Sequence, residues 1–201
     1  MWRTTRRLVG RLSPATWTIL LALAALLVWA LAVRATDAPY DRHEWLPSWA
    51  DDDKNCRDTR QEVLARDAVP GTVKWDDAGC RVTSGWWRDP YSGIKVVDPK
   101  HLDVDHVVPL AWAHAHGGAS WPAEKKQAFA NDLGYRGALL AVSYHANRQK
   151  GDKGPTEWIP PRDGYFACEY GTYWAIVTTL WGLRLDAADR DAIRLLVTFC
   201  R

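Results

Sequence analysis

The chain has 201 residues, of which 47% are hydrophobic and 25% charged, and this length suits one folded domain with its own core. The formal net charge is +2, but the N-terminal segment 1–34 carries five of the 26 basic residues and none of the 24 acidic ones. The rest of the chain, 35–201, therefore has a formal charge of −3. Net charge thus gives no argument for nucleic-acid binding, and attraction to phosphates would need a local basic patch.

An uncharged, mostly apolar run extends from Ala15 to Val33, between an arginine-rich flank and Arg34. Its 19 residues are about enough to cross a hydrocarbon core of ~30 Å as a helix, and the basic flank should stay in the cytoplasm. Small residues near Ala32 and Ala35 resemble signal cleavage sites, so residues 1–34 are either a cleaved signal peptide or a retained transmembrane anchor. Both alternatives predict an extracellular protein, secreted or anchored to the outer face of the cytoplasmic membrane.

The rest of the chain predicts a single α+β domain. Residues 35–54 are rich in proline, aspartate and tryptophan without helical periodicity, which indicates a linker that becomes structured near its end. Asn55 could begin a helix over about 56–66. After it, the sequence predicts short strands at 72–75, 80–83, 94–97 and 102–108, a turn at 89–93, a helix over 121–133, a buried strand at 138–143, a short helix from Asn147, and helices over 173–183 and 187–199. This order favours a compact domain over residues 55–201 rather than alternating β-α units.

All cysteines follow the N-terminal segment, at Cys56, Cys80, Cys168 and Cys200. An even number in an oxidising compartment indicates two disulfides, for which three pairings are possible. We favour Cys56–Cys80 and Cys168–Cys200, because each closes a local loop on its own side of the central motif. A zinc site is the alternative, but no pair has the close Cys-x-x-Cys spacing that such sites favour.

Two polar segments could together supply a hydrolytic site. A carboxylate beside a histidine, as in Asp105-His106, can hold a divalent ion and a proton acceptor together when a later amide such as Asn147 meets them. Strand alternation alone would put Asp103 and Asp105 on one face and His106 on the other. Pro109 cannot donate to a sheet, so regular pairing should fail just past the motif and allow Asp105 and His106 to share one site.

A resemblance to a known family is carried by an ordered set of segments after Lys54. These segments are Gly85-Trp86, Asp89–Gly93, Leu102–Leu110, Phe129–Leu133, Leu140–Ser143, Ala146–Asp152 and Glu157–Pro160. With them the chain resembles the HNH (ββα-metal) endonuclease superfamily, in particular a small exported branch related to the C-terminal domain of GmrSD restriction endonucleases. The resemblance covers most of the chain after Lys54 and implies an α+β domain built around a ββα-metal core.

The resemblance also implies roles for individual residues. Asp105 would be a metal ligand, Asn147 the second protein ligand and His106 the general base, while Asp103 would be an outer ligand or a solvated strand residue. Carboxylate and amide oxygens suit Mg²⁺, which Mn²⁺ or another transition ion could replace. The ion would hold the scissile phosphate while His106 takes a proton from water, which leaves a 5′-phosphate and a 3′-hydroxyl.

Basic residues and one departure from the family pattern bear on this site. Arg148 and Lys150 are candidates for phosphate contacts, or an ordinary charged helix face. The middle asparagine of the HNH motif would stand at Ala138, which cannot orient a histidine, and Asn131 is the candidate replacement. Three other histidines, at 114, 116 and 145, are predicted to be bystanders. The first two resemble a metal pair, but residues i and i+2 on a helix diverge.

The leading functional hypothesis is a DNA endonuclease with little sequence specificity that acts outside the cell. DNA is the expected partner rather than RNA, and a retained N-terminal segment would add the membrane. No helix-turn-helix or zinc-finger reader is visible, so base specificity is not expected. Two alternatives remain open: a catalytically inactive envelope module that binds through the same fold, which Ala138 favours, and a hydrolase of a different phosphodiester.

Overall fold

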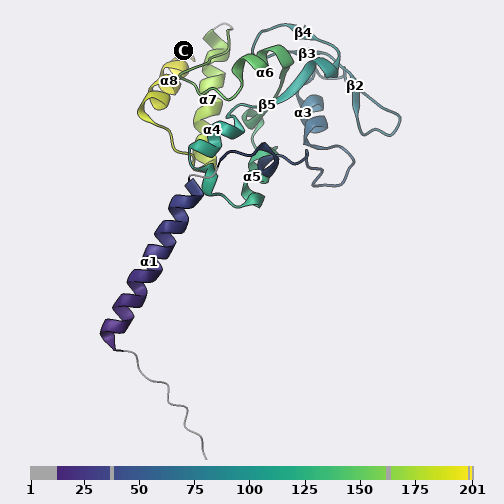
Figure 1. Cartoon of the computed structure of the whole chain (residues 1–201). Coiled ribbons are helices and arrows are strands. Elements are labelled where there is room, and N and C mark those ends of the chain that lie inside the picture. The colour runs from purple at the N-terminus through teal and green to yellow at the C-terminus, as the bar shows by residue number, and fades with distance from the viewer. Residues whose placement is uncertain (1–12, 37–38, 162–163, 199, 201) are drawn as a thin grey trace, which may run out of the picture. The chain divides into compact units, whose positions relative to one another are not determined.

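The computed structural model describes residues 13–36, 39–161, 164–198 and 200, and the chain divides into two units, residues 1–38 and 39–201. The described part of the first unit is mainly helix α1 (Pro14–Thr36), which coincides with the predicted apolar run (Figure 1). Within the residues described, no helix is long and apolar enough to cross a membrane, so the predicted transmembrane anchor is not supported. The arginine-rich flank, residues 1–12, lies outside the described residues.

Residues 35–54 are predicted to form a linker that becomes structured near its end, and in the structure the chain from Pro39 onward belongs to the folded unit. Asp41 caps the short helix α2 (Arg42–Trp45) by accepting a hydrogen bond from the His43 backbone N–H at 2.8 Å. Trp45 is fully buried and packs edge-on against the ring of Phe129. One helical turn is too short to show periodicity in the sequence. Burial of an indole of this size nevertheless stabilises the attachment of α2 to the folded unit.

Next come one helix and two small antiparallel sheets. Helix α3 (Thr59–Asp67) begins three residues later than predicted, because Asp58 rather than Asn55 caps it, accepting from the Gln61 N–H. The sheets pair β1 with β2 and β3 with β4. These strands are β1 (Lys74–Trp75), β2 (Val82–Ser84), β3 (Trp87–Arg88) and β4 (Lys95–Val96). The Cys56–Cys80 disulfide forms as predicted and ties the chain before α3 to the loop before β2.

The centre of the unit is an antiparallel pair, β5 (Leu102–His106) and β6 (Leu139–Ser143), in a register that runs from Leu102 opposite Ser143 to His106 opposite Leu139. Helix α6 (Tyr144–Lys150) starts directly after β6, where the Ser143 hydroxyl accepts from the Ala146 N–H. Two strands and a helix are thus adjacent (Figure 1). The other elements of this region are η1 (Pro99–His101), α4 (Leu110–Ala115), η2 (Gly118–Ser120), α5 (Ala123–Ala130) and η3 (Arg136–Ala138).

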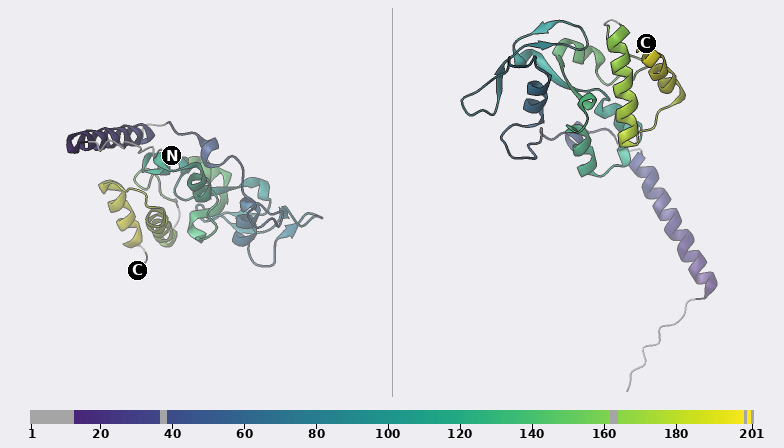
Figure 2. Two further views of the ribbon diagram at one scale, coloured as in Figure 1. Left: turned by 90° about the horizontal axis from the view of Figure 1, so that it is seen from below. Right: turned by 180° about the vertical axis from the view of Figure 1, so that it is seen from behind.

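Two packed helices complete the unit, α7 (Gly164–Trp181) and α8 (Ala187–Thr198). They lie side by side in all views (Figures 1 and 2). Gly171 permits this approach, because a Cβ there would lie 2.6 Å from Cβ of Leu196. Helix α7 starts nine residues before the predicted 173, within a segment whose apolar residues Phe166 and Tyr170 are buried. The α+β class predicted for the domain is confirmed.

The second predicted disulfide, Cys168–Cys200, joins α7 to the end of the chain after α8. Replacing both cysteines with alanine should lower the free energy of unfolding by about 2–4 kcal/mol, because the bridge restricts the unfolded chain. Urea denaturation of the two proteins measures this difference. A change below about 0.5 kcal/mol, the size expected of an ordinary surface substitution, would show that the packing of α7 on α8 suffices without the bridge.

Candidate active site

The end of β5 and the face of α6 meet at a pocket of about 260 Å³. Strand β5 ends at His106 and Pro109 caps α4, so the chain leaves regular pairing at the place expected from the sequence. The residues around the pocket are Arg42, Val104, Asp105, His106, Pro109, Leu110, Asn147, Arg148 and Gly151. The structure therefore brings together four of the predicted site residues.

His106 is buried and held in one orientation. Its Nε2 lies 2.8 Å from the Ala130 carbonyl oxygen, and since a carbonyl only accepts, Nε2 carries the proton and Nδ1 the lone pair. Trp49 stacks on the imidazole at 5.7 Å with an angle of 9° between the planes. Burial lowers the pKa of His106 to about 3, and the positive charge of Arg42 acts in the same direction. The ring is thus neutral at physiological pH, with its lone pair on Nδ1.

Asp105 is the centre of a buried polar network. One carboxylate oxygen accepts from Lys150 Nζ at 2.9 Å and the other from the Tyr91 hydroxyl at 2.5 Å. Lys150 Nζ also donates to the backbone carbonyl of His106 at 2.8 Å. Burial raises the pKa of Asp105 and lowers the pKa of Lys150, while the attraction between the two charges opposes both shifts. This network holds the Asp105 carboxylate rigidly at the pocket.

The structure corrects the expectation that Lys150 contacts phosphate. Its side chain is fully buried, and its ammonium group is engaged by Asp105 and by the His106 carbonyl. Arg148 is the exposed member of the predicted pair and lines the pocket, with its guanidinium 5.1 Å from the ring centroid of Tyr144. Lys150 therefore fixes Asp105 from the protein interior, and Arg148 remains accessible.

Asn147 and Asp103 form the other polar contact of the site. The Asn147 side-chain amide donates from Nδ2 to a carboxylate oxygen of Asp103 at 3.1 Å. This bond turns the Asn147 carbonyl oxygen away from Asp103. Asp103 is half-buried and acts on the pocket through Asn147.

The donor set of the pocket fits a hard divalent cation. Asp105 and Asn147, which come from two different elements, both line the pocket, and the carboxylate and carboxamide oxygens of these residue types suit Mg²⁺. A carboxylate oxygen has two lone pairs, so Asp105 can keep its bonds to Lys150 and Tyr91 and still bind an ion.

Asn131 does not orient His106 as expected. Its side-chain oxygen accepts from the Ala50 N–H at 2.9 Å, and its Nδ2 donates to the Gln127 carbonyl at 3.0 Å. Asn131 therefore closes the end of α5 and holds the segment that carries Trp49. The preceding residue, Ala130, supplies the carbonyl that orients the histidine.

Comparison with known proteins places the chain in a family. Residues 58–194 match the family model described as GmrSD restriction endonucleases, C-terminal domain. The chain belongs to this family. A protein of Arthroderma benhamiae described as an uncharacterized secreted protein is 38% identical over 161 residues, which cover 80% of this chain and 76% of that protein. No solved structure matches the sequence.

Three side chains that contribute to this candidate site could not be picked out from the sequence: Arg42, Trp49 and Tyr91. Tyr91 had a signal, because Asp89 precedes it in a turn-forming segment; the Asp89 carboxylate accepts from the Tyr91 N–H and from the Ser143 hydroxyl. Arg42 follows Asp41, a residue type that favours helix starts. The sequence around Trp49 contains no signal that distinguishes an indole that stacks on a histidine from an indole that fills the core.

Proposed function

We propose that this protein is an exported, metal-dependent endonuclease that hydrolyses phosphodiester bonds of nucleic acid, DNA rather than RNA, with little sequence specificity. The observation that supports it best is the state of His106. Its Nε2 is occupied by the Ala130 carbonyl, which leaves the lone pair on Nδ1, and His106 lines the same pocket as Asp105 and Asn147. Membership of a restriction-endonuclease family supports the reaction class.

In this mechanism each residue of the pocket has one task. Asp105 and Asn147 would hold a divalent cation, which when bound supplies positive charge for the phosphate and the departing oxygen. His106 accepts a proton from the attacking water at Nδ1 as the new phosphorus–oxygen bond forms. The bond from phosphorus to the 3′ oxygen breaks, which leaves a 5′-phosphate and a 3′-hydroxyl. Arg42 and Arg148 bind the phosphate oxygens from the pocket rim.

Export is supported by two independent observations. The protein has two disulfides, which persist in oxidising compartments, and its relative from Arthroderma benhamiae is described as secreted. The apolar N-terminal run would then serve as the signal for export.

The alternative of an inactive binding module depended on Ala138, and the geometry weakens it. The Ala138 backbone carbonyl accepts from the Val107 N–H at 3.1 Å, and Ala138 has no polar side chain. Because the Ala130 carbonyl already orients His106, an asparagine at position 138 is not required for that purpose.

Plasmid cleavage tests the proposal directly. The purified full chain should nick supercoiled DNA with Mg²⁺ or Mn²⁺ and stop when EDTA removes the metal. Asn147→Ala should reduce the rate at least ~10-fold and raise the metal concentration required, because one oxygen donor is lost. Gln149→Ala is the matched control, since Gln149 lies on the same helix and is exposed.

Three outcomes of this assay would contradict the proposal in different ways. Intact plasmid across a full divalent-metal series would favour a binding module. Cleavage of small phosphodiesters without cleavage of DNA would indicate another substrate. Equal rates for Asn147→Ala and Gln149→Ala would remove Asn147 from the metal site.

A further inference from the structure

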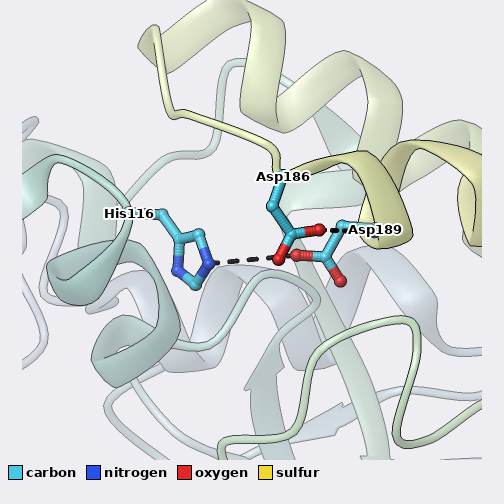
Figure 3. Close-up of side chains that lie close together, drawn as sticks. All are labelled: His116, Asp186 and Asp189. Carbon is cyan, nitrogen blue, oxygen red and sulfur yellow. Dashed lines mark hydrogen bonds and ion pairs between the residues drawn. The ribbon is translucent and has the colours of Figure 1, made fainter.

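A second cluster of metal-ligating side chains lies outside the candidate active site. His116 follows α4 as its C-cap, Asp186 directly precedes α8, and Asp189 lies in the first turn of α8. One nitrogen of the histidine and one oxygen of each carboxylate lie within 4.8 Å of one another. Figure 3 shows the three side chains pointing toward a common centre.

The histidine of this cluster is fixed in a particular tautomer. Its Nδ1 lies 2.7 Å from the Trp112 carbonyl oxygen, so Nδ1 donates and a neutral ring carries its lone pair on Nε2. The ring also stacks on Trp112, with the centroids 3.6 Å apart and the planes 7° from parallel. A backbone carbonyl that fixes one ring nitrogen is the usual support of a metal-binding histidine, because it directs the other nitrogen at the ion.

The open distance between His116 and the carboxylates suits an ion between them. His116 Nε2 is 3.8 Å from a carboxylate oxygen of Asp189, which is too far for a hydrogen bond. In the neutral tautomer both atoms are acceptors and cannot satisfy each other. A cation bound to both at about 2.0–2.2 Å would resolve this conflict.

Neighbouring protein groups hold the carboxylates of the cluster in place, and one side of the cluster is accessible to solvent. Asp189 is buried, and one of its oxygens accepts from the Thr156 hydroxyl at 3.4 Å. The Asp186 carboxylate accepts from the Asp189 N–H at 2.8 Å, so its position is set by the start of α8. His116 is half-buried and Asp186 exposed, which provides a path of entry for an ion.

We propose that His116, Asp186 and Asp189 form a second metal site that binds a divalent transition-metal ion of the Zn²⁺ class. One imidazole nitrogen and two carboxylate oxygens complete three positions of a tetrahedral shell, and water takes the fourth. The ion has a structural task, because it connects the end of α4 to the start of α8. The Arg184 N–H, which donates to the His116 carbonyl at 2.8 Å, already joins these two regions.

Calorimetric titration with Zn²⁺ tests the site in the full chain, produced without a polyhistidine tag and stripped with EDTA. The titration uses an Asn147→Ala background, which weakens metal binding at the active-site pocket, so that a failure here is distinct from a failure of the nuclease proposal. We expect one Zn²⁺ per chain. Asp186→Asn should weaken binding at least tenfold, since the amide oxygen can still cap α8 but the charge is lost.

Two further variants keep the test decisive. His116→Phe preserves the stacking on Trp112 and removes the nitrogen donor, so it should also weaken Zn²⁺ binding at least tenfold. Asp191→Asn removes the same charge from the exposed side of α8 and should bind like its parent. Absence of Zn²⁺ binding in the Asn147→Ala protein, or unchanged affinity in both cluster variants, would overturn the proposal. Anomalous diffraction at the zinc edge should place the ion between His116 Nε2 and the two carboxylates.

Discussion

His106→Ala is expected to reduce the rate of plasmid nicking by ~10²–10⁴-fold, the usual contribution of a positioned general base. The physical reason is that His106 is buried and fixed through Nε2, carries its lone pair on Nδ1, and lines the same pocket as the proposed ion ligands Asp105 and Asn147. The arginines of the pocket are untouched, so affinity for DNA should change little. Single-turnover cleavage at saturating protein and a separate binding assay measure the two quantities.

The control for this experiment is His145→Ala. His145 lies on α6, two residues before Asn147, and its side chain is exposed. Removing the His106 ring also removes its stacking with Trp49, so near-ultraviolet circular dichroism should accompany the kinetics to establish that both variants are folded. A His106→Ala protein that is folded and keeps more than a tenth of the activity would show that another group takes the proton from water.

The meeting of Asp105, His106 and Asn147 could be predicted from sequence because each is tied to an element with a clear signal. The first two end a strand before a proline, and the third lies on the helix that follows the second strand. The group that orients the histidine could not be predicted. It is the carbonyl of Ala130, a backbone atom that every residue has, and only the path of α5 relative to β5 brings it within 2.8 Å.

The folding of the segment before α3 and the burial of Lys150 could not be predicted either, and the reason is different. A single turn such as α2 has no periodicity, and its attachment depends on Trp45 reaching a core that is distant in sequence. Lysine on a short polar helix is most often a solvated residue. Whether it is buried is decided by a carboxylate that lies 45 positions earlier, and local patterns contain no such information.

The second cluster, around His116, also depends on contacts between residues that are distant in sequence. Its spacing from His114 argued against a metal pair, and the two side chains indeed have different surroundings: His114 is buried, and His116 faces Asp189. The partners of His116 come from the start of α8, much later in the chain. Only the packing of α8 brings the carboxylates to the histidine.

Lys150→Met should lower the free energy of unfolding by about 3–5 kcal/mol, the usual effect of breaking one side of a buried ion pair. Methionine fills much of the space of lysine, so the loss comes from the charge and not from a cavity. Asp105 would keep one hydrogen bond, from Tyr91, while buried and charged, and the His106 carbonyl would lose its bond to Nζ. Denaturant unfolding measures the difference. Lys153→Met is the control, because Lys153 is exposed and should change stability by less than about 0.5 kcal/mol.

A double variant separates the effect of the charge from that of packing. If the uncompensated carboxylate causes the loss of stability in Lys150→Met, adding Asp105→Asn should restore part of that stability. Asp105→Asn alone should destabilise the protein, because it leaves Lys150 unpaired. The coupling free energy between the two positions would then be large and favourable. If the double variant is less stable than Lys150→Met by the full cost of Asp105→Asn alone, the two side chains act independently. In that case the Asp105–Lys150 contact does not hold the carboxylate at the pocket.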